Sequence, residues 1–403
     1  MTRTISTAIV TAAIAVLGSV LVYTGDQDAS RARILELARR GTPAETWAAW
    51  NALPTSQNKL RLGIDVAIAL KDLPRGIDLY DQLATQAAPP ATTTEADDAL
   101  RRLTLAIASE LIAGSDLDAG IAACSAALRL SATAQPCRQR LEHMANLGTT
   151  IGEQAIGAYA LADAGLAPES GLMATLEGGL SPSARLQFAT RFRHLPAAQR
   201  VALLQPLVAG PDATLRYQAL LSLGEIRHPD AAAAIHGALV DSTLLRTAQT
   251  IALAGQGEPA SLDALGSMVG TLDDYTKVPA ALALARAGDA RGSVLLDELM
   301  RSAVDLQRIM AASAVTQLNR ETAAPTILAS LTSGSPAIRP LALEAAGPAH
   351  LGRQRAVYTR LVGGEPVTRA AAVAAIADTL TAIELPASQL PPAPAPPPLP
   401  TTR

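Results

Sequence analysis

Apolar positions recur with a helical spacing through the second half of the chain. They keep register with a basic side chain that returns every 30 or 31 residues, at Arg185, Arg216, Arg246, Lys277, Arg308, Arg339 and Arg369. Three residues after each stand Phe188, Ala219, Gln249, Ala280, Ala311, Ala342 and Ala372, and seven residues after each stand Phe192, Leu223, Leu253, Leu284, Val315, Ala346 and Ile376. Only Gln249 is polar in these two columns. Because offsets of three and seven fall on one face of an α-helix, each unit is predicted to hold a helix with an inner stripe of small and apolar residues.

Two further columns predict a second helix in each unit. Nineteen residues after the basic position stand Leu204, Ile235, Leu265, Leu296, Ile327 and Tyr358, and four residues later stand Val208, Leu239, Val269, Met300, Leu331 and Val362. Pro or Gly falls between the two helices, as in residues 228–230, 257–259 and 288–289, where it ends the first helix. Paired helices with this period are typical of an α-solenoid, in which each unit packs on its neighbours.

One unit carries a family resemblance. Residues 212–230, which read DATLRYQALLSLGEIRHPD, are similar to a HEAT-like repeat of the kind first noted in phycobilin lyases, and looser copies extend over residues 151–385. The resemblance implies an all-α fold, a right-handed α-α superhelix of the HEAT or armadillo type. It implies little about chemistry, because the same repeat serves scaffolds, adaptors and a few enzymes.

Residues 30–150 also follow a helical pattern, but they do not align with the repeat period. Helices are predicted near residues 30–40, 44–53, 58–71, 75–87, 96–113, 117–131 and 136–146, separated mostly by prolines. These helices are interpreted either as degenerate copies of the same repeat or as tetratricopeptide-like hairpins. The polar, proline-containing segment 88–95 is predicted to be a loop.

The N-terminal segment, residues 1–29, is interpreted as a membrane anchor or signal sequence. No charged residue occurs from Thr4 to Gly25, a length that can cross a bilayer as a helix. An uncleaved transmembrane anchor is favoured over a cleaved signal because no small-x-small site follows Val22. Asp26 and Asp28 after the apolar run favour a cytoplasmic N-terminus and an extracytoplasmic body, although arginines at positions 31–40 weaken this asymmetry.

The C-terminal end shows a different pattern. The last basic position, Arg369, is followed by one helical segment, 367–383, and position nineteen after it is already within a proline-rich tail. The helix is therefore expected to act as the closing cap of the stack. Residues 386–403 are expected to form a disordered, extended tail.

Composition and charge limit the function. The chain has 403 residues, of which 49% are hydrophobic but only 2% aromatic, as expected for Ala- and Leu-rich helices that approach closely. The net charge of −3 argues against a nucleic-acid partner, because nucleic-acid binding needs a basic stripe that displaces counterions from phosphates.

Residue groups that could carry chemistry are few. The five histidines, His143, His194, His228, His236 and His350, are scattered, and no catalytic, metal-binding or cofactor-binding motif is present. His-Glu pairs of the HEAT-like di-iron hydroxylases are also absent. Cys124 and Cys137 flank a predicted turn, where they could form a disulfide in an oxidising compartment or remain two buried thiols.

The basic column itself is interpreted as structural. Each basic side chain is expected to pair with an acid of its own or the adjacent unit, in exposed pairs worth about 0 to 1 kcal/mol each. The alternative is a row of donors that face an acidic partner.

These observations favour a membrane-anchored, extracytoplasmic, non-enzymatic scaffold that binds protein partners, with no cofactor and no evident small-molecule substrate. Two alternatives stay open: an enzyme or chromophore-loading factor of the lyase type, and an adaptor that faces the cytoplasm.

Overall fold

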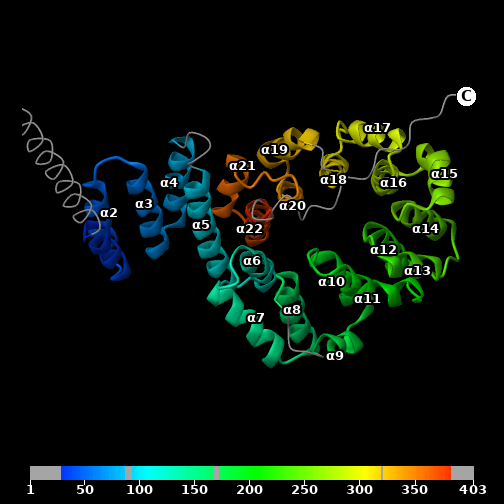
Figure 1. The fold of residues 1–403 in the computed structure, drawn as a ribbon, viewed down its shortest axis with the longest axis horizontal. Helices are drawn as coiled ribbons and strands as arrows, with labels where there is room; N and C mark the ends of the chain where they lie inside the picture. Colours follow the sequence, from blue (N-terminus) through cyan, green and yellow to red (C-terminus); the bar gives the residue numbers. More distant parts are fainter. Residues whose placement is uncertain (1–28, 87–92, 167–171, 319–320, 383–403) are drawn as a thin grey trace, which may run out of the picture. The chain divides into compact units, whose positions relative to one another are not determined.

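The computed structural model describes residues 29–86, 93–166, 172–318 and 321–382, and every regular element in these ranges is a helix (Figure 1). Residues 1–28 of the proposed anchor and all of the proline-rich tail lie outside the described residues. Within them, no helix has the length and apolar character needed to cross a bilayer. Contacts divide the chain into two units, which meet between Ala106 and Ile107.

The first unit contains short antiparallel helices. A helix at residues 29–39 is followed by α2 (Pro43–Asn51), α3 (Gln57–Ala69), α4 (Leu73–Gln86) and the first part of α5 (Thr93–Ala113). Trp47 and Trp50 pack edge to face, and the Arg75 guanidinium lies 3.7 Å from the centre of the Trp47 ring. The two tryptophans, each 8% exposed, form an aromatic contact in the core of this unit.

The second unit is a succession of helix pairs. The helices that lead each pair are α6 (Leu117–Leu130), α8 (Ile151–Asp163), α10 (Pro182–Arg191), α12 (Ala213–Glu225), α14 (Thr243–Gly255), α16 (Asp274–Arg286), α18 (Asp305–Thr316), α20 (Arg339–Ala346) and α22 (Pro366–Thr381). The helices that follow them are α7 (Gln135–Leu147), α9 (Leu172–Gly179), α11 (Ala197–Val208), α13 (Pro229–His236), α15 (Pro259–Met268), α17 (Ala290–Leu299), α19 (Ala324–Ser333) and α21 (Arg355–Tyr358). Three short 3-10 turns, η1 (Val269–Thr271), η2 (Glu321–Ala323) and η3 (Thr359–Leu361), extend or introduce the second helices.

The predicted apolar columns form the core of this unit. Every residue at the third and seventh offsets is buried except Gln249, which is half-buried and donates from its side chain to the Ile235 carbonyl. All residues at the nineteenth offset are buried as well. The column at offset twenty-three fails at Leu239, which is 50% exposed because α13 ends at His236. The all-α fold of paired, packed helices is therefore confirmed.

Side-chain caps set where several leading helices begin. Asp212, four residues before Arg216, accepts from the amides of Thr214 and Leu215 at the start of α12. In α14 the cap is Ser242 rather than the neighbouring Asp241, whose carboxylate pairs with Arg216 instead. The acids before the basic column therefore divide between capping and ion pairing.

The stack does not end in an open cap. The leading helices contact one another in order from α6 to α22, and α22 packs against α6 (Figure 1). The predicted closing helix thus exists, but it closes the unit on itself instead of covering a free end. Buried alanines on both helices, including Ala123, Ala127, Ala372 and Ala375, allow the two backbones to approach.

The three helices before the clear repeats belong to the second unit. Contacts divide the chain between Ala106 and Ile107, and α6, α7 and α8 pack within the second unit; the division at residue 150, where the basic column fades, stays a prediction about the kind of repeat. Cys124 on α6 and Cys137 on α7 form a disulfide, and both residues are fully buried. The helix that receives α22 is thus covalently tied to its own pair.

Candidate functional site

A groove of about 330 Å³ lies along the contact between the last helix and α6. One wall is the face of α6 from Asp118 to Arg129, and the other is the face of α22 from Val367 to Asp378. Residues 190–194, at the end of α10 and just after it, complete the groove together with the start of α20. Most lining residues between the ends of the two walls are alanines, so small side chains line the middle of the groove.

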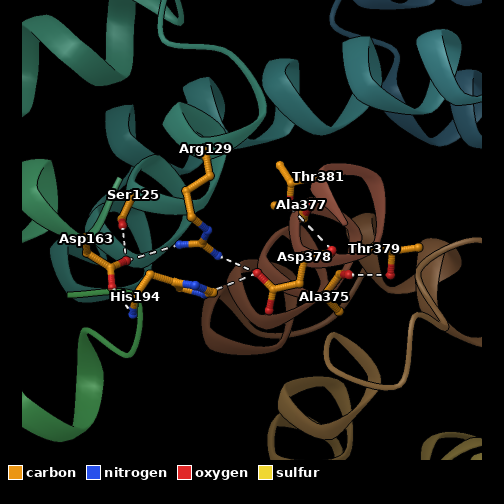
Figure 2. A network of polar contacts seen from close by, with 9 residues as sticks. All are labelled: Ser125, Arg129, Asp163, His194, Ala375, Ala377, Asp378, Thr379 and Thr381. Carbon is orange, nitrogen blue, oxygen red and sulfur yellow. Dashed lines mark hydrogen bonds and ion pairs between the residues drawn. The ribbon is translucent and has the colours of Figure 1, made fainter. Parts of the chain in front are cut away.

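Arg129 stands at the centre of a polar network at one end of this groove (Figure 2). Its Nη1 donates to Asp163 Oδ2 at 3.1 Å, and its Nη2 donates to Asp378 Oδ1 at 2.8 Å. One guanidinium therefore joins the end of α8 to a residue on α22 that lies 249 positions later in the chain than Arg129. The side chains of Arg129 and Asp378 are each only 13% exposed, so this pair is shielded from solvent.

Each carboxylate of the network has a further partner. Ser125 Oγ, one helical turn before Arg129, donates to Asp163 Oδ2 at 2.6 Å, and the His194 amide donates to Asp163 Oδ1 at 2.8 Å. The His194 side chain contacts the carboxylate of Asp378, with its Nε2 at 3.3 Å from Asp378 Oδ1. The turn after α10 is thus tied to α8 through its backbone and to α22 through its side chain.

These contacts set the charge state of Asp378. Burial alone would raise the pKa of its carboxyl, but the hydrogen bond from His194 and the positive charge of Arg129 outweigh burial, and the pKa is lowered. Asp378 is therefore held as a carboxylate, in a position where an unpaired charge would be costly.

The network contains the residue types of a hydrolytic triad without the required geometry. Ser125 donates to Asp163, whereas the His194 ring faces Asp378, and no hydrogen bond of the described residues joins Ser125 to His194. A serine nucleophile needs a base within hydrogen-bond reach. In the described ranges no group of His, Cys, Asp and Glu has the arrangement of a metal site. The network joins α6, α8, α22 and the turn after α10.

The basic column caps helices as well as pairing with acids. Guanidinium groups of four of its members donate to carbonyls at or just beyond the end of the preceding second helix: Arg185 to Glu177, Arg216 to Gly210, Arg308 to Ser302 and Arg369 to Leu361. A cation at this place complements the helix dipole and satisfies a free carbonyl. Acids are also partners, in the pairs Arg216–Asp241, Lys277–Asp274, Arg308–Asp305 and Arg369–Glu110.

Three members of the column depart from the expected exposed pairs. Arg216 is only 3% exposed, so its pair with Asp241 is not a surface interaction on the arginine side. Arg246 is exposed at the start of α14, and Arg339 has a buried Nε without a hydrogen-bond partner. The column is thus a structural register with unequal contributions.

The same register continues one unit further back than the sequence showed. Gln154 lies 31 residues before Arg185, on α8, and its Nε2 donates at 2.9 Å to the carbonyl of Gly148, just after α7. The neutral amide of Gln154 makes the contact that arginine makes in later units. The acceptor carbonyl lies six residues before the donor, as it does for Arg216 and Arg308. A search for basic residues could not detect it.

Sequence reasoning missed most of the site. His194 was noted only as one of the scattered histidines, and Arg129, Asp163 and Asp378 were not singled out. The other histidines lie apart from the groove: His143 is exposed, His236 faces Glu258 at 3.7 Å, and His228 caps α13. No periodic signal marks Arg129 and Asp378, because their partnership depends on closure of the unit.

Comparison with known proteins supports the repeat assignment for part of the chain. A family model of HEAT repeats matches residues 200–285, which extend from within α11 to near the end of α16. Neither the curated proteins nor the solved structures give a significant match to the chain. The described part of the chain is thus all-helical, and the chain carries a HEAT-repeat domain, with the match spanning residues 200–285.

Proposed function

We propose that the protein is a non-enzymatic scaffold that binds a protein partner in the groove between α6 and α22. The observation that carries the proposal is exposed apolar surface at one end of this groove. Val367 lines the groove and is 48% exposed, and Leu117 and Leu341, which are 41% and 36% exposed, precede and follow the lining residues Asp118 and Pro340 in the sequence. Exposed apolar side chains next to charged groups are typical of protein-binding sites.

The fold supports this role in two ways. HEAT repeats present a continuous surface built from successive helices, and such surfaces commonly bind other proteins. Closure of the second unit fixes the groove walls through the Arg129 network, so partner binding would cost little ordering of the scaffold.

The proposal includes attachment to a membrane through residues 1–29, with the body outside the cytoplasm. The uncharged N-terminal run and the disulfide between Cys124 and Cys137 support this location, because structural disulfides persist in oxidising compartments. Sedimentation with membranes and protease accessibility of the body in spheroplasts test it. A body that is protected in intact spheroplasts and cut only after lysis would favour the cytoplasmic orientation instead.

Crosslinking followed by affinity capture from detergent-solubilised membranes tests partner binding at the groove. Val367→Asp should abolish capture of the crosslinked partner, since it places a charge in the apolar end. The matched control is Val304→Asp, at a residue 58% exposed before α18 and away from the groove lining. Equal capture by both variants would remove the groove from the proposal.

A further inference from the structure

A second cavity, of about 530 Å³, lies at the opposite end of α14 from Arg246. Its lining comes from the turns that follow α12, α14 and α16, and its charged side chains are Arg227 and Arg286, with His228 beside them. The lining holds no acidic residue. We call this space, lined by Arg227, His228 and Arg286, the cationic cavity.

The cavity exists because its floor is almost bare of side chains. Residues 254–257 read Ala-Gly-Gln-Gly, and a Cβ on Gly255 would stand 2.6 Å from the Gly224 carbonyl oxygen. The ends of α12 and α14 thus meet backbone to backbone, which leaves open space between the two flanking arginines. Gly257 adopts a φ of 87°, a conformation that favours glycine and keeps the turn free of a side chain.

Helix capping does not account for the two arginines. The carbonyls of Leu223 and Ile226 at the end of α12 accept from Gln256 Nε2, each at 2.8 Å. At the end of α16, backbone amides of residues 287–289 satisfy the carbonyls of residues 283–285. The carbonyls at these two helix ends, which usually attract cations, therefore accept hydrogen bonds from other donors and not from the two guanidinium groups.

Within the described part of the chain, the two arginines of the cavity have no ion-pair partner, although acids lie nearby: Asp230 Oδ2 is 3.6 Å from His228 Nδ1, and Glu225 lines the small pocket beside Arg286. Among the described residues, no carboxylate lies within ion-pair distance of Arg227 or Arg286, and the hydrogen-bond partner of Arg286 is the neutral amide oxygen of Gln317. Burial lowers the pKa of Arg286, with Glu225 opposing this shift and Arg227 adding to it. Arg286 is half-buried and Arg227 is exposed, so a bound anion would offset both the burial of Arg286 and its repulsion by Arg227.

The size and surroundings of the cavity indicate a chain segment rather than a free ion. A water-sized species occupies about 30 Å³, so a single small anion would leave most of the cavity to solvent. Leu221 lines both a pocket between α10 and α12 and a small pocket that borders the cationic cavity and is lined by Gly255, Arg286 and the exposed Glu225. The pocket between α10 and α12 carries only uncharged side chains, among them Gln187 and Gln218. An extended segment could follow this track and place its acid in the cavity.

We propose that the cationic cavity binds a carboxylate carried on an acidic segment of a protein partner. The proposal rests on the scaffold function and assigns a second contact for the partner, separate from the groove at α22. Arg227 and Arg286 donate to the carboxylate, the backbone floor accommodates the chain, and His228 borders the entrance.

Fluorescence anisotropy of fluorescein-labelled hexaglutamate with the full chain at low ionic strength tests the assignment. The double variant Arg227→Gln/Arg286→Gln should weaken binding by at least about tenfold, since charge-assisted hydrogen bonds are lost. Arg246→Gln, an exposed cation at the other end of α14, should change it less than about twofold, because a distant surface charge is screened by salt. Circular dichroism checks that the variants are folded.

Three results would overturn the inference: no measurable binding to the wild type, equal binding by the double variant, or an equal loss in Arg246→Gln, which would indicate attraction by net charge alone. Inorganic phosphate is the competing arm. Displacement of hexaglutamate by phosphate at lower concentration than by acetate would indicate a phosphate site instead. If Val367→Asp loses partner capture and the double variant binds hexaglutamate as the wild type does, the scaffold proposal stands and the cavity proposal fails. If Val367→Asp keeps partner capture and the double variant loses hexaglutamate binding, only the cavity proposal stands.

Discussion

At the residue scale, the second unit depends on one arginine placed between two carboxylates. Arg129 reaches Asp163 and Asp378 at once, and Ser125 and His194 supply the remaining donors. Such an arrangement is costly to desolvate and contributes to stability only while every member is present. Its value lies in specifying which helices meet, since a misplaced α22 would leave buried charges without partners.

Replacing Arg129 by Met should lower the free energy of unfolding by about 3 kcal/mol, because two largely buried carboxylates lose their common cation. Arg138→Met is the matched control: its pair with Glu142 on α7 is 43% exposed on both sides, and the loss should stay below about 1 kcal/mol. Urea denaturation followed by far-UV circular dichroism measures both. Similar losses in the two variants would show that the network is no stronger than a surface pair.

The lowered pKa of Asp378 predicts a pH dependence of stability. A carboxyl whose pKa is lower in the folded than in the unfolded chain stabilises the fold above its unfolded pKa, and this contribution disappears as pH falls through the folded pKa. The difference in urea midpoint between the wild type and Asp378→Asn should therefore be largest near neutral pH and shrink in acid. A difference that stays constant from neutral to acid pH would contradict the assignment.

At the element scale, the sequence predicts helix positions wherever the same buried position recurs in each repeat. It does not predict which side chains form hydrogen bonds. The columns at Leu223, Leu284 and Ile376 are buried as predicted, because a residue that faces the neighbouring unit must be apolar in every repeat. The column of basic residues does not include Gln154, although its side chain makes the same contact with a carbonyl. A hydrogen bond to a carbonyl needs a donor and does not need a charge. Leu239 was misplaced because a hydrophobic residue beyond a helix end keeps the spacing but loses the face.

Close packing of α12 against α14 predicts an unusual response to alanine. Gly-to-Ala changes inside helices usually stabilise by up to about 1 kcal/mol. Gly255→Ala should instead destabilise by about 1 to 3 kcal/mol, because the new Cβ would stand 2.6 Å from the Gly224 carbonyl oxygen. Gly178→Ala on α9, where nothing lies within 4 Å, should be neutral or stabilising. Thermal unfolding compares the two, and stabilisation by Gly255→Ala would mean that the two backbones are further apart.

At the scale of the whole molecule, sequence periodicity predicts a stack but cannot say whether its ends meet. The repeat identifies neighbours along the chain, whereas α22 and α6 are brought together by the accumulated rotation of many units. The candidate site is formed at that meeting point, so the elements could be predicted and most of the site could not. Arg129 and Asp378 are separated by 249 residues, and neither residue stands out in the sequence of its own helix. Only closure of the unit brings the two side chains together.

Closure predicts that the terminal helix is protected as well as an internal one. In an open solenoid the last helix frays, and its amides exchange with solvent faster than those of central units. Here the amides of α22 should exchange as slowly as those of α14, because α6 covers its outer side and Arg129 holds Asp378. Asp378→Arg should place two cations together at the junction and accelerate hydrogen–deuterium exchange in both α22 and α6, with α14 as the internal reference. Fast exchange of α22 in the wild type, or acceleration limited to α22 in the variant, would indicate an open stack, since only a closed one transmits the change to a helix 249 residues away.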